Sequence, residues 1–575
     1  MEFIDPKKKK IASLIKIEGT TASDIYALLA VPQDSALGDY ALPCFRFAKE
    51  MRMPPAAIAT KITEDILSRP HPFAAVEAVG GYVNFRFDAL ETAAAILDEI
   101  ITKKSEYGTS LIGAGKTVCI DYSSINIAKP FHIGHLSTTV IGGALYRIYK
   151  KLGYNAVGIN HLGDWGTQFG KLIVAYKRWG NKADIIKRGV SALNEIYVKF
   201  HKEAENNAAL EDEARYYFKK IEDGDKEAME LFSLFKDITL KEVDEIYKRL
   251  DIQFDSYNGE AFYNDKMQPV LDELESLNLV SVSQGAKIVD LEPYGMPPCL
   301  LVKADGATLY ATRDLAAAFY RKATYCFYKC LYVVAYQQNL HFQQVFKVVE
   351  LMGKEWAKDL VHIPFGMVSL EDGTMSTRKG KVVLLKDVFD RAVQKSLEII
   401  SEKSPALKNK EVAAEKIGVG AVVFSALSNN RIKDIVFSYD KVLNFDGETA
   451  PYIQYTNARA RSVLRNLGAN LEEYFAAALT KDELSGIANK EGEAVISLLE
   501  RFPAVLFDAV ERYEPSFLTR YIIDLSKAFN KFYLEHRILN APDSEKRSRA
   551  ALVYAVHTVI EEGLHLLGIA APEEM

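Results

Sequence analysis

The side chains of this sequence best suited to chemistry are two histidines in the segment His132-Ile133-Gly134-His135. The segment follows a predicted strand and loop and opens a predicted helix. A helix N-terminus offers free N–H groups and partial positive charge, which suit a phosphate, and residues three apart share one helix face. Gly134 would let a base or ribose pack against the backbone. The pattern favours a nucleotide site, while two histidines without a role and an H-x-x-H metal site remain open.

A basic, glycine-containing segment is the second candidate. GTMSTRKGK, residues 373–381, lies just beyond a predicted strand, and its Arg378, Lys379 and Lys381 could hold a polyphosphate. Such a segment taken alone is equally typical of a solvated surface loop. Whether these two segments form one nucleotide site therefore depends on the helices and strands that would bring them together.

Those elements alternate between strands and helices from Thr117 onward. TVCIDYS and AVGIN are short apolar runs typical of buried strands, and each is followed by a stretch with helical spacing of apolar residues. CLYVVAY (330–336) and HIPFGMV (362–368) are expected as later strands of the same sheet. This order predicts a parallel sheet with right-handed crossovers, and sheets of this type bind ligands at the carboxyl ends of their strands.

The rest of the chain predicts flanking domains. A helix over 56–67 and a strand in GGYVNFRF indicate a small N-terminal α+β domain, and the residues after about 440 have the apolar stripes of packed helices. We expect an α/β multidomain protein with domains at 1–110, 111–440 and 441–575. Within the second, residues from about 180 to 300 are predicted as a helical insertion, and 385–440 as helical.

Composition limits the classes of protein that fit. The 575 residues carry a net charge of -6, so the overall basic excess usual in nucleic-acid binders is absent. Five cysteines without a C-x-x-C pair argue against a disulfide framework and favour a reducing compartment. The N-terminal residues do not resemble a signal peptide, and no apolar run is long enough to span a membrane. We therefore expect a cytoplasmic protein; Lys7–Lys10 is expected to be a solvated tail or an RNA contact.

Together and in this order, the motifs resemble those of class I aminoacyl-tRNA synthetases. HIGH is the first signature of that class, and MSTRKG is similar to its second. SSINIAKPFHIGHLSTTVIGG, NHLGDWGTQFGKL, LYATRDLAAA, YVVAYQQNLHF and YIQYTNARARSVLRN are each similar to segments of arginyl-tRNA synthetases. The resemblance extends over essentially the whole chain.

This resemblance implies an activity, its substrates and a domain plan. Arginine would react with ATP, accompanied by Mg²⁺, to give arginyl-adenylate, and the arginyl group would pass to tRNA(Arg). The plan is a Rossmann-like catalytic domain, an N-terminal domain that contacts tRNA and a helical anticodon-binding domain. The family is usually monomeric, and no protein-bound metal is implied.

Site residues follow from the same resemblance. The catalytic and ATP-binding set is His132, Gly134, His135, Lys129, Met375, Ser376, Arg378 and Lys379. The arginine-binding set is Asp121, Asn126, His132, Tyr310, Asp314 and Gln338. Asp314 would be the principal partner of the guanidinium, since carboxylates pair with it bidentately. If Tyr310-Ala311-Thr312-Arg313-Asp314 is helical, its two ends share a face, although Asp314 could instead only favour the helix dipole.

Two further groups of residues are less specific. His161, Gly163, Asp164 and Gln168 would border the active site, although His161 could equally cap or pack. For tRNA, Arg461 with Arg465 and Lys527 with Lys531 could form basic helix faces, and Tyr452 and Tyr455 could stack on bases. Packing and solvated charge are the alternatives for each.

The chain departs from the family pattern at two places. Thr374 stands where the second signature usually begins with lysine, and the chain ends Glu573-Glu574-Met575 where arginine commonly precedes the final methionine. We hypothesise that Lys129 and Lys379 supply the missing charge. Three other functions remain to be distinguished: a class I synthetase for another amino acid, a non-catalytic RNA-binding relative and a metal hydrolase.

Overall fold

The computed structural model describes residues 5–32, 34–370 and 383–575. The chain divides into two compact units, which are described separately. One unit contains 1–112, 456–508 and 520–563, and the other contains 113–455, 509–519 and 564–575. Among the described residues, no helix combines the length and the apolar character needed to cross a bilayer. The three-domain division at 110/111 and 440/441 stays a prediction.

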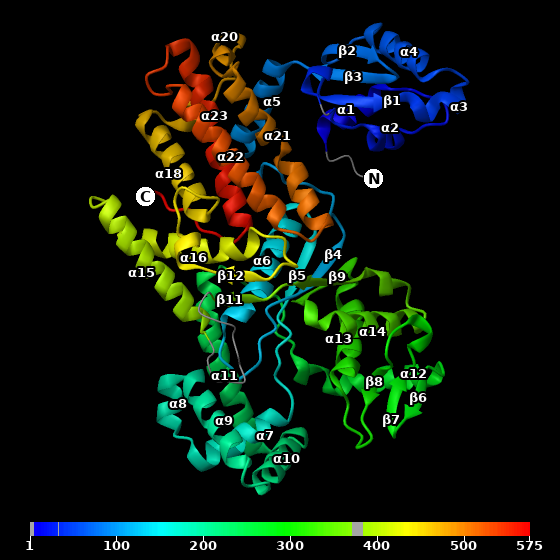
Figure 1. Cartoon of the computed structure of the whole chain (residues 1–575), viewed down its shortest axis with the longest axis vertical. Helices are drawn as coiled ribbons and strands as arrows, with labels where there is room; N and C mark the ends of the chain where they lie inside the picture. The colour runs from blue at the N-terminus through cyan, green and yellow to red at the C-terminus, as the bar shows by residue number, and fades with distance from the viewer. Residues whose placement is uncertain (1–4, 33, 371–382) are drawn as a thin grey trace. The chain divides into compact units, whose positions relative to one another are not determined.

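A four-stranded parallel sheet lies at the centre of the second unit (Figure 1). Its strands are β4 (Thr117–Asp121), β5 (Asn155–Ile159), β9 (Lys329–Ala335) and β10 (Leu360–Phe365), in the order β10-β9-β4-β5. The chain runs from β4 through helix α6 (Leu136–Lys151) to β5, and β9 lies on the other side of β4. The strand order therefore reverses at the carboxyl end of β4, where such sheets bind ligands. The predicted Rossmann-like arrangement is confirmed.

HIPFGMV was expected as a later strand of this sheet, and β10 confirms the expectation as far as Phe365. The segment forms the end of β10, and then Val368 opens β11 (Val368–Leu370), which pairs in parallel with β12 (Ile435–Phe437) in a separate sheet. Gly366 lies at the break, where an added Cβ would come within 2.4 Å of the backbone of Lys433. β12 also corrects the expectation that 385–440 is helical throughout.

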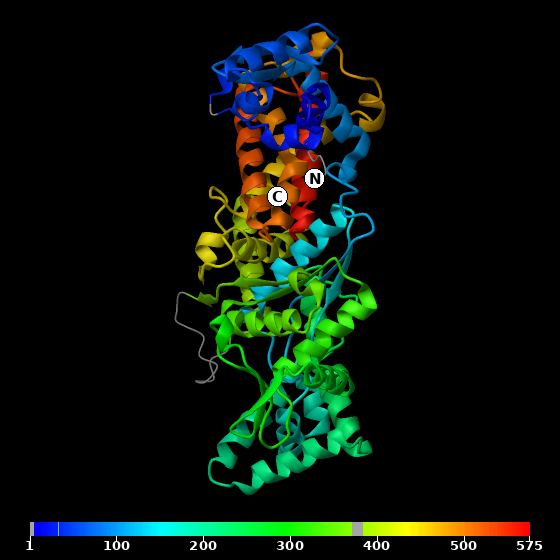
Figure 2. The ribbon, with the colours of Figure 1, turned by 90° about the vertical axis from the view of Figure 1, so that its right-hand side faces the viewer.

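The predicted insertion is largely helical, as expected, but it also contains strands. Helices α7 (Thr167–Trp179), α9 (Val190–Ala204), α10 (Ala209–Glu222) and α11 (Lys226–Arg249) pack with the short α8 (Lys182–Arg188) into a helical group (Figures 1 and 2). After α12 (Met267–Ser276), strands β6 (Val280–Ser283), β7 (Ala286–Val289) and β8 (Cys299–Val302) form an antiparallel sheet that was not predicted. Gln284 and Gly285, both with positive φ, make the two-residue turn that joins β6 to β7.

Two long helices follow this small sheet and complete the part of the fold that positions the site. They are α13 (Tyr310–Tyr325) and α14 (Asn339–Leu351), on either side of β9 in the chain. Their apolar faces join β4 and β9 in one buried core that includes Leu315, Ala318, Cys330 and Val348. This burial holds the polar ends of both helices in fixed positions relative to the sheet.

The N-terminal residues form the expected small α+β domain, visible as one blue body in both views (Figures 1 and 2). Its antiparallel sheet has the order β1 (Tyr40–Pro43), β3 (Tyr82–Phe87), β2 (Phe73–Val79), and α4 (Pro55–Leu67) covers it. Lys7–Lys10 belongs to helix α1 (Pro6–Leu14), which Asp5 caps, and Lys7 pairs with Glu500 at 3.0 Å. The expectation of a solvated tail was therefore wrong.

The predicted helical character of the C-terminal residues is confirmed. The remaining helices of the chain are α2 (Ala22–Leu28), α3 (Ala48–Met51), α5 (Ala89–Lys103), α15 (Leu385–Lys403), α16 (Lys410–Leu427), α17 (Tyr439–Val442), α18 (Ala450–Asn466), α19 (Leu471–Tyr474), α20 (Lys481–Leu484), α21 (Lys490–Glu511), α22 (Ser516–Glu535) and α23 (Asp543–Leu566). The last four long ones, α18, α21, α22 and α23, supply most of the helical bundle.

Candidate active site

The loop that leaves β4 holds an unusual backbone conformation. Ser123, Ser124 and Ala128 have positive φ angles of 69°, 44° and 59°, a region that non-glycine residues seldom adopt and that clusters at functional sites. Hydrogen bonds hold the loop in place, including those from the Ser123 N–H to Thr138 Oγ1 (3.0 Å) and from the Ala128 N–H to Thr239 Oγ1 (3.0 Å). The Thr138 hydroxyl in turn donates to the Val333 carbonyl of β9 at 2.7 Å. One threonine of α6 thus joins the ends of β4 and β9.

Asn126 and Gly163 meet where this loop passes the segment after β5. The Ile127 N–H donates to the Gly163 carbonyl (3.1 Å), and the Gly163 N–H donates to the Ile125 carbonyl (2.8 Å). A Cβ at Gly163 would lie 2.3 Å from Asn126 Oδ1, so only glycine fits without moving Asn126. Asn126 is exposed, as expected for a residue that contacts a ligand.

The two signature histidines lie against each other at the start of α6. Their ring centroids are 4.0 Å apart. His132 Nδ1 accepts the Gly134 N–H at 3.1 Å, so a neutral His132 carries its proton on Nε2 and can donate it outward. Burial, with the nearby Lys129 charge, lowers the pKa of His132, and burial with the His132 neighbour lowers the pKa of His135 to about 3. At neutral pH both rings are therefore uncharged.

The chain returns to these histidines after residues 371–382. The Ile133 N–H donates to the Val383 carbonyl at 3.1 Å, and the Leu385 N–H donates to the Phe131 carbonyl at 3.0 Å. The backbone that follows the second signature segment therefore pairs with the first signature. The predicted residues Thr374, Met375, Ser376, Arg378 and Lys379 themselves lie outside the described residues.

Asp121, the last residue of β4, has a charged partner within the protein. Its carboxylate accepts from Arg321 Nη2 at 2.7 Å and from the Ser124 hydroxyl at 2.6 Å. The Arg321 side chain is 1% exposed. Burial opposes its charge, but the Asp121 carboxylate outweighs this and raises the pKa of Arg321 well above its ordinary value. Arg321 was not predicted; its position seven residues after Asp314, on the same helix face, was the available signal.

Tyr310 and Asp314 both lie in the first turns of helix α13. The segment is therefore helical, and the two side chains share one helix face as expected. Asp314 Oδ2 is 2.6 Å from Nε2 of His341, and the Tyr310 and His341 ring centroids are 4.8 Å apart. Burial opposes ionisation of Asp314, yet the His341 hydrogen bond helps to lower its pKa. His341 was also missed, although it lies in the quoted segment YVVAYQQNLHF. Gln338 lies just before α14 and is exposed.

The residues after β5 have mainly structural contacts. Asp164, 1% exposed, is 2.8 Å from Lys236 Nζ and accepts the Ala261 N–H at 2.9 Å, so it ties α11 to the loop before α12. His161 packs against Tyr263, with ring centroids 5.4 Å apart, and its Nδ1 is 3.4 Å from Arg321. Gln168 donates to the Trp165 carbonyl. His161 alone of these three reaches the group around Asp121.

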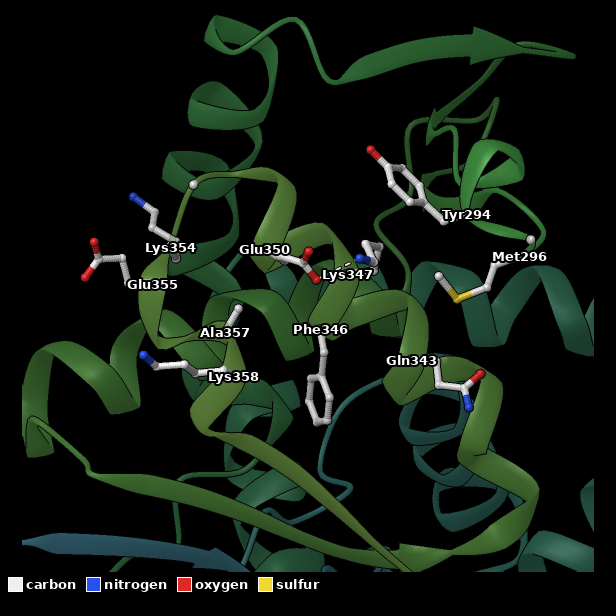
Figure 3. A pocket seen from close by; sticks show the side chains of 12 residues that line it. Tyr294, Met296, Gln343, Phe346, Lys347, Glu350, Lys354, Glu355, Ala357 and Lys358 are labelled. Carbon is white, nitrogen blue, oxygen red and sulfur yellow. Dashed lines mark hydrogen bonds and ion pairs between the residues drawn. The ribbon is translucent and has the colours of Figure 1, made fainter. Parts of the chain in front are cut away.

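A separate hollow of about 770 Å³ lies at the far end of α14 (Figure 3). Tyr294, Met296 and Phe346 line it together with lysines 347, 354 and 358. Two of the lysines are already paired, one with Glu350 and one with Glu273. No residue predicted for the site lines this hollow, so it is distinct from the group around Asp121 and Asp314.

Comparisons with known proteins match this geometry to a family. A family model described as "tRNA synthetases class I (R), catalytic domain" matches residues 96–439. The arginine--tRNA ligase of Alkaliphilus metalliredigens is 52% identical over 570 residues, 99% of each chain, and that of Clostridioides difficile is 51% identical over 97% of this chain and 98% of its own. The chain belongs to the arginyl-tRNA synthetase family.

Solved structures and two further family models agree with this assignment. The Thermus thermophilus arginyl-tRNA synthetase matches with a TM-score of 0.78 and 26% identity, covering 95% of this chain and 96% of that chain. The Plasmodium falciparum arginyl-tRNA synthetase has a TM-score of 0.76 over 100% and 98% of the two chains, and its 21% identity supports the fold alone. "Arginyl tRNA synthetase N terminal domain" matches 7–87, and "DALR anticodon binding domain" matches 453–575.

The residues that were predicted to contact tRNA lie on the C-terminal helices. Arg461 of α18 pairs with Glu561 at 2.8 Å, and Lys531 of α22 pairs with Glu491 at 3.1 Å. Tyr455 is 43% exposed, while Tyr452 is half-buried and Arg465 and Lys527 are exposed. Arg461 and Lys531 are thus already paired within the protein, and the tRNA role of the whole set stays a prediction.

Proposed function

We propose that this chain attaches L-arginine to tRNA(Arg) in two steps that consume ATP. A carboxylate oxygen of arginine attacks the α-phosphorus of ATP, the bond to the β-phosphate oxygen breaks, and pyrophosphate leaves. The 3′-terminal adenosine hydroxyl of the tRNA then attacks the carbonyl of arginyl-adenylate, and AMP leaves. Support comes from relatives named arginine--tRNA ligase, one of which is 52% identical to this chain over 99% of both sequences. The observation that supports arginine as the substrate is the Asp314 carboxylate, which has one oxygen available to a ligand.

Asp314 is suited to a cationic side chain. Its Oδ2 is bonded to His341, whereas Oδ1 has no hydrogen-bond partner among the described residues, and the side chain keeps 24% exposure. An ionised carboxylate has roughly four acceptor sites, so most of them are available to a guanidinium. Tyr310 on the same helix face is 60% exposed and would cover the planar cation.

The other predicted contacts would hold the α-amino and carboxyl groups of arginine. Asp121 and the exposed Asn126 and Gln338 would serve this role, together with His132. Asp121 would bring a charge that Arg321 already partly balances. Such contacts fix the reacting carboxylate, and holding two reactants in line supplies much of the acceleration in reactions of this type.

The phosphates would be met at the start of α6. A neutral His132 donates from Nε2, His135 lies beside it, and Gly134 leaves the backbone open to the nucleotide. Donors fixed where negative charge develops stabilise the transition state of phosphoryl chemistry. Lys129, exposed on the loop before the histidines, would add a positive charge, and Met375, Ser376, Arg378 and Lys379 would complete the ATP contacts. Mg²⁺ would arrive with ATP as part of the substrate.

For the tRNA, we propose contacts through the N-terminal domain and the C-terminal helices, with Tyr452, Tyr455, Arg461, Arg465, Lys527 and Lys531 as candidates. The description of the matched C-terminal family model supports this. We further propose that the chain acts as a monomer in the cytoplasm.

Exchange of labelled pyrophosphate into ATP, measured over all amino acids with and without tRNA, tests the function. Exchange that appears only with arginine and tRNA(Arg) together is the expected result. Exchange with another amino acid would favour a different class I synthetase, and no exchange at all would favour a non-catalytic relative. Strong exchange without tRNA would contradict the expected requirement for bound tRNA. Metal analysis of the purified protein tests the remaining alternative, because a metal hydrolase would contain bound metal.

A further inference from the structure

The contact between His341 and Asp314 is unusually close for two side chains from different helices. Nε2 of His341 lies 2.6 Å from Oδ2 of Asp314, slightly shorter than is usual for a charge-assisted N–H···O hydrogen bond. His341 is 10% exposed and comes from the first turn of α14, whereas Asp314 comes from α13. The bond therefore fixes one carboxylate oxygen of Asp314 from outside its own helix.

Neighbouring rings hold His341 in this orientation. Tyr310 lies at a ring-centroid distance of 4.8 Å with an angle of 60° between the planes, and Phe342 lies at 5.1 Å with 63°. Phe342 is itself buried in the core beside β9. The imidazole is thus set by packing, and the carboxylate plane is set by the imidazole.

The orientation of that plane matters for a planar cation. A guanidinium pairs with a carboxylate through two parallel N–H···O bonds only when the two planes are aligned. Aspartate has a short side chain whose terminal torsion is broad, so an unrestrained Asp314 would present its open oxygen in many directions. Restricting that freedom before arginine arrives lowers the cost of binding.

We infer that His341 is a positioning residue that orients the Asp314 carboxylate for the guanidinium of arginine and thereby sets the affinity for this substrate. The inference rests on the proposed function. It concerns binding of the amino acid rather than the reacting atoms, so it affects the KM for arginine more than kcat. The residue acts through Asp314 and needs no contact of its own with the substrate.

A pair of variants isolates the hydrogen bond from the volume of the ring. In His341→Gln the side-chain amide N–H extends about as far as Nε2 of histidine, whereas in His341→Asn it is shorter by one carbon. The arginine KM of H341N should rise about ten- to a hundredfold, as expected for the loss of a hydrogen bond to a charged group. The KM of H341Q should stay within about threefold of the native value by the same scale. The kcat and the ATP KM should change little in either variant.

The controls separate this inference from the proposed function. Asp314→Asn is measured in the same assay, and the melting temperature of each variant reports on folding. If the native protein does not charge tRNA with arginine, the proposed function fails. If the native protein does charge tRNA with arginine, two outcomes overturn the role of His341 while leaving the proposed function intact. They are an unchanged arginine KM in H341N and an equal rise in H341N and H341Q. Equal ATP KM values in both variants show that the nucleotide site is intact. A variant that fails to fold is recognised by its melting curve, and the arginine KM of the other variant then tests the role of His341.

Discussion

Arg321 and Asp121 form a buried ion pair, 2.7 Å between Nη2 and Oδ2, at the carboxyl end of the central strand. The two residues are 200 positions apart in the chain. Their pairing joins α13, which carries Asp314, to β4, which leads into the signature histidines. The amino-acid side and the nucleotide side of the proposed site therefore share one structural connection.

Removal of the arginine should destabilise the fold strongly. In Arg321→Met the Asp121 carboxylate would stay buried without its cation, which typically costs about 3–5 kcal/mol. Urea unfolding measures the difference from the native protein. The matched control is Arg188→Met, which removes an arginine 42% exposed and paired with Asp184 at 3.0 Å; a loss below about 1 kcal/mol is expected there. Similar losses in both variants would contradict the importance of burial.

The lowered pKa of His135 predicts a pH-dependent stability. The unfolded imidazole binds a proton near pH 6.5, whereas the folded one does so only near its pKa of about 3. Between these values the unfolded state holds more protons, so stability is lost as pH falls from 6.5 toward 3. In His135→Asn this contribution disappears, and the drop in unfolding free energy from pH 7 to pH 5 should be smaller by about 2 kcal/mol. Equal drops in the two proteins would be evidence against the buried neutral histidine.

The Asp314→Asn variant should lose affinity for arginine. The amide keeps the shape of the carboxylate but not its charge, and losing one partner of a desolvated charge pair costs about a hundredfold or more in binding. The arginine KM in tRNA charging measures this. Asp305→Asn, an exposed carboxylate shortly before the same helix, serves as control and should behave as native. An unaltered KM in D314N would remove Asp314 from the site.

Lys129→Ala tests whether this lysine compensates for Thr374 in the second signature. Loss of a cation beside the developing phosphate charge should slow pyrophosphate exchange about tenfold or more. Lys248→Ala, which removes an exposed lysine of α11 paired with Asp244 at 2.7 Å, is the control and should not slow exchange. If both variants exchange at the native rate, Lys129 does not supply the missing charge.

Gly163→Ala should displace Asn126, a proposed arginine contact, without removing any of its polar atoms. The added methyl would lie 2.3 Å from Asn126 Oδ1, so Asn126 must move, and a misplacement of about 1 Å near reacting groups can cost a hundredfold in rate. The kcat/KM for arginine is the measurement. Gly447→Ala, where an added Cβ meets its nearest atom at 3.5 Å, is the matched control. A native value in G163A would mean that Asn126 does not need its present position.

The strands of the parallel sheet and the helix after the first signature could be predicted from the sequence because their apolar runs are long and regular. The hairpin of β6 and β7 was missed because Gln284-Gly285 is not one of the common turn pairs, although both residues adopt the positive φ that the turn needs. The break after β10 depends on the close approach of Lys433 to Gly366, which no local pattern records.

Within the candidate site, local spacing predicted which residues share a face but not which partners they meet. Tyr310 and Asp314 could be related by helical spacing, since both lie on one helix. His341 and Arg321 reach Asp314 and Asp121 from other elements, and such pairings depend on the packing of α13 and α14 against the sheet. The likeness to the family supplied the proposed ligand contacts, whereas the side chains that hold them became visible only in three dimensions.

The Thr138 hydroxyl accepts one hydrogen bond and donates another, and together these bonds limit the movement of α6. Since this one hydroxyl joins the turn after β4 to the carbonyl of Val333 in β9, a tilt of α6 alone would break its hydrogen bonds to that turn and to β9. The proposed phosphate donors and the carboxyl ends of β4 and β9 would therefore move together, and the conformational entropy of arranging them is lost when the chain folds and not again at each turnover.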